Sequence, residues 1–225
     1  MFRDDFISRQ IQIFVQILAR ILGLSKGREF LDAQALLEIT FREQLGTDIY
    51  TFLTTPDEHM VDFLTLGQRD TTALTRCGFA VALLQTAATL YREAGKVDQG
   101  MAYLQKALNL LLEMELTVEE APELPEFVPT VEELIEGADL HQLTTDSRGA
   151  LVFYFERVGT YTSAEKVLNS MLTDQPHDEE TRALAISFYE YLLDESDEQL
   201  EKGGLPREQI QKALATHSYF RKKGV

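Results

Sequence analysis

Histidines beside carboxylates are the residues of this chain with the clearest potential for chemistry. His59 follows Asp57 and Glu58, and His177 precedes Asp178 and two glutamates. Such groups bind metal ions or transfer protons, but a helical metal site needs two ligands about one turn apart, and no two of the four histidines are that close in sequence. Both clusters stand at expected helix starts, where acidic side chains cap a helix. We therefore expect capping rather than a metal site, and no cofactor.

No other constellation of residues points to catalysis. The single cysteine, Cys77, lies in the apolar stretch LTRCGFAVALL, which favours a core residue over a nucleophile. The chain lacks a dinucleotide-binding glycine pattern, a phosphate loop and a nucleophile elbow. Acidic pairs such as Glu132-Glu133 are adjacent in sequence, and adjacent residues of a helix do not face each other. We expect no catalytic residues and no enzyme activity.

Charge is strongly acidic and unevenly distributed. The 225 residues include 37 acidic and 21 basic side chains, a formal net charge of −16. Residues 113–200 carry a net −18 and residues 201–225 a net +4. Nucleic-acid binding is disfavoured because a phosphate backbone needs a basic surface. The acidic segment is either a solvated face or a docking surface for a basic partner.

The apolar N-terminal stretch does not have the pattern of a targeting segment. Residues 1–24 are interrupted by glutamines and arginines, so no apolar run reaches the length of a signal peptide or a membrane span. We expect no membrane span and, with a single thiol, a cytoplasmic location.

Apolar residues recur at helical spacing nearly everywhere, and no convincing alternating strand is present. The pattern predicts an all-α protein. Helices are expected at about 6–24, 28–45, 56–66, 71–94, 96–115, 129–136, 144–158, 161–173, 178–200 and 206–223. Three of the six prolines fall within the acidic stretch 117–129, which we expect to be a connector that is irregular and exposed over residues 117–128.

An internal repeat stands out from this pattern. Adding 64 to the residue numbers of one helical hairpin gives the equivalent residues of a second. The first series is Leu84, Ala88, Tyr91, Gly95, Val97, Gly100, Leu104 and Ala107, and the second is Arg148, Val152, Phe155, Gly159, Tyr161, Ala164, Leu168 and Met171. Each has an apolar helix, a glycine turn, and a second helix that begins near a small residue. We expect Tyr91 and Phe155 to be buried at equivalent places.

These residues resemble a tetratricopeptide repeat (TPR), whose consensus has the same order of aromatic, glycine and small residues. The segments ALLQTAATLYREAGKVDQGMAYLQKAL and LVFYFERVGTYTSAEKVLNSMLTDQP carry the resemblance. Val97 replaces the usual aromatic residue, and the offset of 64 is not a multiple of the usual period. Residues 180–220 are a candidate third, degenerate hairpin containing Phe188, Tyr191, Ala213 and Phe220. The implied architecture is a short TPR-like α-solenoid with an N-terminal helical pair.

The whole chain also resembles an uncharacterised family of bacterial cytosolic proteins, mostly from Gram-positive organisms. The resemblance rests on RDDFISRQIQIFVQILARILGL, FLDAQALLEITFREQLG and LYREAGKVDQGMAYLQKALNLLLE. It supports the architecture and implies no chemistry. For domains, we expect residues 1–66 to form a helical segment that packs on a repeat region, 67–225, interrupted by the connector, in one compact domain.

The first hypothesis for function is a non-catalytic module that binds a protein or peptide. The first helices of stacked hairpins line a common surface. The candidates on that surface are Gln85, Thr89, Arg92, Phe153, Glu156 and Arg157. Repeats that clamp acidic tails have lysines and asparagines at such places, so that class of ligand is disfavoured here.

The alternative hypothesis is a structural or self-associating protein. The first helix has nine apolar members, more than one neighbour usually covers, and Ile13 and Ile17 are the outer ones. Burial between two helices of the same chain would also explain these apolar residues. A helix on a membrane surface, with Arg9 and Arg20 at its polar edge, explains them less readily. A small-molecule sensor or enzyme is a third hypothesis without direct support.

Overall fold

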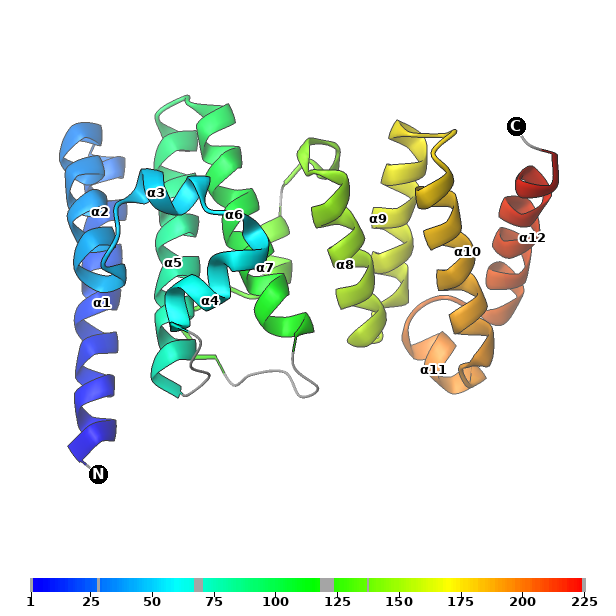
Figure 1. Ribbon diagram of the computed structural model, residues 1–225, viewed down its shortest axis with the longest axis horizontal. Coiled ribbons are helices and arrows are strands. Elements are labelled where there is room, and N and C mark those ends of the chain that lie inside the picture. The colour runs from blue at the N-terminus through cyan, green and yellow to red at the C-terminus, as the bar shows by residue number, and fades with distance from the viewer. Residues whose placement is uncertain (1, 28, 67–70, 118–123, 137, 224–225) are drawn as a thin grey trace. The chain divides into compact units, whose positions relative to one another are not determined.

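The computed structural model describes residues 2–27, 29–66, 71–117, 124–136 and 138–223, and the side chains of these ranges except those of 2–7, 71–72 and 218–223. Within these ranges every regular element is a helix and no strand is present, which confirms the all-α fold class (Figure 1). The chain divides into two compact units, Met1–Ala138 and Asp139–Val225.

The first unit is built around one buried helix. Its elements are α1 (Phe2–Lys26), α2 (Phe30–Leu45), α3 (Ile49–Thr54), the short 3-10 helix η1 (Asp57–His59), α4 (Met60–Thr65), α5 (Thr71–Glu93), α6 (Val97–Leu116) and α7 (Val131–Ile135). Helices α1, α2, α4 and α6 all pack against α5. The N-terminal helices thus pack on α5 as their core. The domain boundary expected between residues 66 and 67 lies inside this unit.

Two local features of the first unit explain its helix boundaries. The pattern of apolar residues does not predict α3, which begins where the Asp48 carboxylate accepts a hydrogen bond from the Thr51 amide at 2.9 Å. The expected start near Pro56 is correct in position, although the chain first makes the 3-10 turn η1. Short capped turns of this kind carry too few apolar residues to give a periodic signal.

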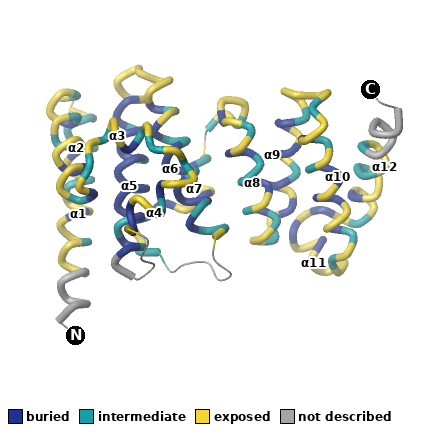
Figure 2. The backbone as a smooth tube through the Cα atoms, viewed as in Figure 1, coloured by how far each residue is buried: buried dark blue, intermediate teal, exposed yellow. Residues whose placement is uncertain are grey.

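Helix α5 is the one element of the described chain that is long and apolar enough to cross a membrane. Residues Ala73–Glu93 meet that test, but 78% of the window is buried inside the first unit. A buried core helix meets the same criteria of length and composition. Figure 2 accordingly shows α5 as buried along most of its length, and the described residues contain no clear membrane span.

Helices α5 and α6 form the first hairpin, and its turn is repeated at the second. Gly95 and Gly159 both take left-handed backbone angles, with φ of +76° and +75°. The amide after each glycine donates to the carbonyl of the helix-ending aromatic residue, from Lys96 to Tyr91 and from Thr160 to Phe155, at 2.9 Å in both. This six-to-one bond is the Schellman closure of a helix. The expected burial of Tyr91 and Phe155 is confirmed.

The small residue of the first repeat marks a close approach of two backbones. A Cβ at Gly100 would lie 2.9 Å from the Ala88 carbonyl oxygen, closer than van der Waals contact allows. The departure at Val97 also has a structural consequence, because Val97 is exposed whereas its equivalent Tyr161 is buried. The first hairpin therefore lacks the ring that closes the corresponding end of the second.

The second unit contains two hairpins of its own. Its elements are η2 (Leu140–Gln142), α8 (Thr145–Arg157), α9 (Tyr161–Asp174), α10 (Glu179–Asp194), α11 (Asp197–Lys202) and α12 (Arg207–Lys223). Helix α8 pairs with α9, and α10 pairs with both α9 and α12. The single helix expected over 178–200 is wrong: the backbone is extended at Glu195, and Ser196 starts α11 through a capping box with Gln199.

A second offset, of 34 residues, relates α10 to α8. Thr144 caps α8 by accepting from the Ser147 amide, and Asp178 caps α10 by accepting from the Thr181 amide. Adding 34 to Phe155 gives Tyr189, which is also buried. In the candidate third hairpin Phe188 is buried as well, but Tyr191 is 43% exposed, and the side chain of Phe220 lies outside the described residues.

The connector is more ordered at its end than the sequence suggests. Residues 118–123 lie outside the described part of the chain. Phe127 stacks on Phe79 and meets Phe14 edge-on, with ring centroids 5.3 and 5.4 Å away, and Val128 is buried. The expectation of exposure over 117–128 is therefore wrong at this end. Gly78 makes the docking possible, since a Cβ there would lie 2.7 Å from a Val128 methyl group.

The burial of Phe155 gives a direct test of the second hairpin. Phe155→Ala should lower the free energy of unfolding by about 3–5 kcal/mol, because it opens a cavity in the core of the hairpin. Phe153→Ala is the matched control: Phe153 lies on the same helix but is 50% exposed, and its loss should cost well under half as much. Urea melts followed by circular dichroism measure both values. Equal costs for the two variants would contradict the assigned orientation of α8.

Candidate functional site

The sequence-predicted surface residues divide between the two units. Gln85, Thr89 and Arg92 lie on α5, and Phe153, Glu156 and Arg157 lie on α8. Because they belong to different units, each trio is described as a surface of its own.

The α5 trio forms a narrow polar strip. From residue 77 to residue 92, Gln85, Thr89 and Arg92 are the only side chains that are not buried. Their spacing of four and three residues places them on one line along the helix. The packing of α1, α2, α4 and α6 covers the rest of α5, so the first unit offers little of this helix to a partner.

The α8 trio belongs to a wider surface. Phe153 and Arg157 are exposed and Glu156 is half-buried. The residues 34 positions later on α10, Ser187, Glu190 and Tyr191, are all exposed. We call this set the α8–α10 face: Phe153, Glu156, Arg157, Ser187, Glu190 and Tyr191. The α10 members were missed by sequence reasoning, although the matching caps at Thr144 and Asp178 carried the signal.

Acidic groups of the second unit converge at one end of this face. Burial, and then the nearby Glu195 carboxylate, raise the pKa of Glu156 above its ordinary range. A hydrogen bond to Glu195 is the first cause that raises the pKa of Tyr191 to about 12, followed by burial and by the charges of Glu195 and Glu156. The pKa of Tyr161 is also raised, by burial and by the same two carboxylates. Residues from α8, α9 and α10 thus meet here.

The neighbouring glycine turn closes this end of the second unit. A Cβ at Gly203 would lie 2.2 Å from the ring of Tyr161, so only glycine fits against it. The Gly203 carbonyl accepts hydrogen bonds from the amide of Thr162 at 3.0 Å and from its hydroxyl at 3.1 Å. The loop after α11 therefore holds the start of α9, and with it the ring of Tyr161, in a fixed place beside the two carboxylates.

The carboxylates beside His59 and His177 serve structural purposes. Asp178 caps α10, as expected, with a bond of 2.7 Å from Thr181. Asp57, however, is not a cap: its carboxylate binds Lys106 at 2.6 Å and also accepts from Asn109. The expectation of capping is wrong there because η1 lies against α6, whose buried lysine needs a counter-charge.

A second ion-pair network lies in the second unit and includes His141. Asp174 binds the buried guanidinium of Arg148 at 2.6 Å and His141 at 2.7 Å, and both partners hold its pKa below the ordinary value. Arg148 stands where the repeat pattern expects an apolar residue, and its pairing with Asp174 explains how it can be buried. Within the described chain, no group of three or more metal-ligating side chains comes together.

Cys77 is a core residue. Its thiol is fully buried in α5, and burial, followed by the charge of Glu113, raises its pKa to about 12. A thiol with a raised pKa carries almost no thiolate at neutral pH and is a poor nucleophile.

The predicted self-association residues lie on α1. Ile13 is 56% exposed and Ile17 is half-buried, whereas Phe14 and Ile21 are fully buried. The side chains of the predicted members Phe6 and Ile7 lie outside the described residues. The apolar stripe of α1 is therefore wider than its contacts with α2 and α5 cover.

Comparison with known proteins gives a match to one family. A sequence model of the Family of unknown function (DUF6483) matches residues 1–221. The chain belongs to this family. The expected membership of an uncharacterised family is thus confirmed. No curated protein and no solved structure matches the chain.

The carboxylates of the α8–α10 face generate a prediction about pH. The folded-state pKa of Glu156 lies above its ordinary 4.5, so the folded state binds its proton more tightly than the unfolded state does. The stability from this proton is fully present below the unfolded pKa and is lost as pH rises through the folded one. Glu156→Gln should therefore raise the midpoint of thermal unfolding at about pH 7 and have little effect below about pH 4.

The matched control is Glu190→Gln, the exposed residue 34 positions later. It should leave the midpoint nearly unchanged at both pH values. A variant Glu156→Gln that is less stable than the parent at neutral pH would show that the carboxylate has a stabilising partner, contrary to the assigned repulsion.

Proposed function

We propose that the protein is a non-catalytic binding module made of tetratricopeptide-like hairpins, and that it binds a protein or peptide on the α8–α10 face. The offset of 34 residues between α8 and α10 carries this proposal. It relates two caps, Thr144 and Asp178, and two buried rings, Phe155 and Tyr189. A period of 34 residues is that of the tetratricopeptide repeat.

The exposed residues support the same conclusion. In stacked hairpins, the first helix of each repeat faces a shared binding surface. Here Phe153 and Tyr191 are aromatic side chains exposed on two such helices, and aromatic residues are enriched where proteins bind each other. Serine and glutamate, not lysine and asparagine, accompany them, which disfavours the acidic tails that other repeats clamp.

The absence of catalysis is part of this proposal. Cys77 is held in the core, and Asp57, Asp174 and Asp178 serve ion pairs and a helix cap. A binding role inside the cytoplasm fits a chain with one thiol and an acidic surface. The acidic charge also disfavours nucleic acid as the partner.

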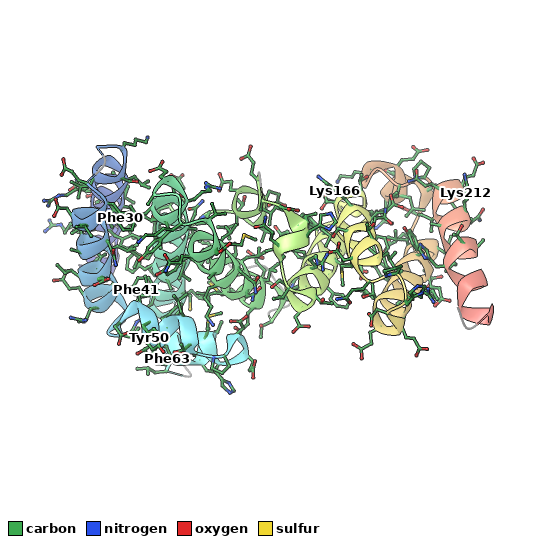
Figure 3. The ribbon with its side chains drawn as sticks, turned by 90° about the horizontal axis from the view of Figure 1, so that it is seen from above. Phe30, Phe41, Tyr50, Phe63, Lys166 and Lys212 are labelled. Atoms are coloured by element: carbon green, nitrogen blue, oxygen red, sulfur yellow. The ribbon has the colours of Figure 1, made fainter. Side chains whose placement is uncertain are left out.

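The test compares affinity isolation by three forms of the full chain. The parent should recover a reproducible set of proteins, and the double variant Phe153→Ala and Tyr191→Ala should lose most of that set because both exposed rings are removed. The control is the double variant Lys166→Ala and Asn169→Ala, which changes exposed residues of α9 instead. Figure 3 labels Lys166 on this helix. It should recover the same proteins as the parent. Equal recovery by all three forms would contradict a binding role for this face.

Self-association through the first unit is the second candidate. Ile13 on α1 and Ile39 on α2 are both more than half exposed, and these two helices contact each other. Their charges are opposite: residues 8–26 carry Arg9, Arg20 and Lys26 and no acid, whereas α2 carries three acids and a single arginine. In a two-fold pair, α1 of each copy would lie against α2 of the other, so the apolar and charged groups would match.

Sedimentation equilibrium tests this second candidate. The parent should have the mass of two chains at micromolar concentration, and Ile13→Glu with Ile17→Glu should have the mass of one, since two carboxylates would be desolvated against the acidic α2 of the other copy. The single variant Ile13→Glu should weaken the dimer while keeping the helix content, because Ile13 is the more exposed of the two. A parent mass of one chain would exclude the dimer.

A further inference from the structure

We infer that the ligand of the α8–α10 face is a cationic peptide segment, in which lysine or arginine stands beside aromatic or long apolar residues. This inference rests on the proposed function and adds the chemistry of the partner. It is carried by three features of the second unit: its excess of acidic groups, the way its few cations are used, and the apolar side chains between the charges.

The two helices of the face carry far more acid than base. Helix α8 contains Asp146 and Glu156, and α10 contains Glu179, Glu180, Glu190 and Asp194, with Glu195 directly after it. The cations of these helices are already used inside the protein. Arg148 is buried and binds Asp174, and Arg182 donates to the Pro176 carbonyl. Arg157 remains on the face and is itself engaged in an interaction within the chain.

Glu156 and Glu195 lie close enough for their charges to interact, while the Arg207 guanidinium near Glu195 binds the Asp197 carboxylate and the carbonyls of Leu193 and Glu195. The causes that shift the pKa of Glu156 are its burial and the charge of Glu195, and both disfavour the ionised form. A lysine or arginine of a partner placed between the two carboxylates would reverse this repulsion. The unbound face therefore gains electrostatic free energy from a cation that it would not gain from a neutral or acidic ligand.

Apolar groups flank the carboxylates and fit the same class of ligand. Phe153 lies one turn before Glu156 on α8, and Tyr191 lies on α10 four residues before Glu195, which directly follows that helix. An arginine or lysine beside an exposed ring makes a cation–π contact, and its methylene stem packs on apolar surface. The Tyr191 hydroxyl is hydrogen-bonded to Glu195, so the phenol stays neutral and its ring remains available for this contact.

Other occupants fit the face less well. An acidic tail or a nucleic-acid backbone would add like charges to Glu156, Glu190 and Glu195. A purely apolar helix would leave these carboxylates desolvated and unpaired, which is costly. A basic peptide satisfies the carboxylates and covers the rings together.

The experiment is a selection of random twelve-residue peptides displayed on phage, using the full chain as bait. Selected peptides should be enriched in lysine and arginine next to aromatic or long apolar residues. For the best binders, fluorescence anisotropy should show a Kd about tenfold weaker with Glu156→Gln and again with Glu195→Gln, because each removes one charge-assisted contact. The Kd should also weaken as salt is raised.

Two controls separate this inference from the proposed function. Lys166→Ala, on α9, should leave the Kd unchanged, and the double variant Phe153→Ala and Tyr191→Ala should abolish binding of any peptide that uses the face. Peptides that bind the face but are neutral or acidic, or that bind Glu156→Gln as tightly as the parent, would overturn the cationic ligand and leave the binding role intact. A selection that enriches no peptide dependent on Phe153 and Tyr191 would overturn both.

Discussion

The burial of one aromatic ring in the first helix of each hairpin is the constraint on which the surface chemistry depends. Tyr91, Phe155 and Tyr189 are each held in the interior of their unit. In the two complete glycine turns, the backbone bond from the following amide to the ring-bearing residue locks the helix end as well. A helix whose ring points inward cannot rotate about its axis, so residues two before and two after the ring must face outward. That rotation places Phe153 and Arg157 on one helix, and Ser187 and Tyr191 on the other, at the surface.

The same hairpin serves two different purposes in the two units. In the first unit, α1, α2 and α4 pack on α5, which turns the first helix of the hairpin into a core helix and leaves only a strip of polar side chains. Gly78 and Gly100 then allow the connector and α6 to approach α5 closely. In the second unit, α8 keeps an exposed side because its partner α9 covers only part of it. The candidate binding surface therefore falls on the unit with fewer covering helices (Figure 2).

Local chemistry made most of the fold predictable, and tertiary contacts account for what was missed. Glycine spacing and apolar periodicity located the hairpins and the buried rings, because these signals are encoded in consecutive residues. The capping box at Ser196 was overlooked inside a long apolar pattern, although its residues were visible in the sequence. The docking of Phe127 and Val128 depends on the space beside Gly78, which no local pattern reveals. The α8 half of the candidate site was predictable from the repeat. The α10 half required the 34-residue offset, which is hard to see because the residues equivalent to Phe153 and Arg157 are of different types, Ser187 and Tyr191.

The acidic character of the second unit acquires a physical meaning from this arrangement. A solvated acidic surface would separate its carboxylates, because repulsion and desolvation both destabilise the folded chain. Here Glu156 and Glu195 are brought near each other and near Tyr161 and Tyr191, while Arg148 is held away from them by Asp174. The fold thus keeps two mutually repelling carboxylates at this end of the face, at some cost in stability. Such a loss of folding stability is found at binding sites. A bound ligand of opposite charge offsets the repulsion between the carboxylates, which remains in the free protein.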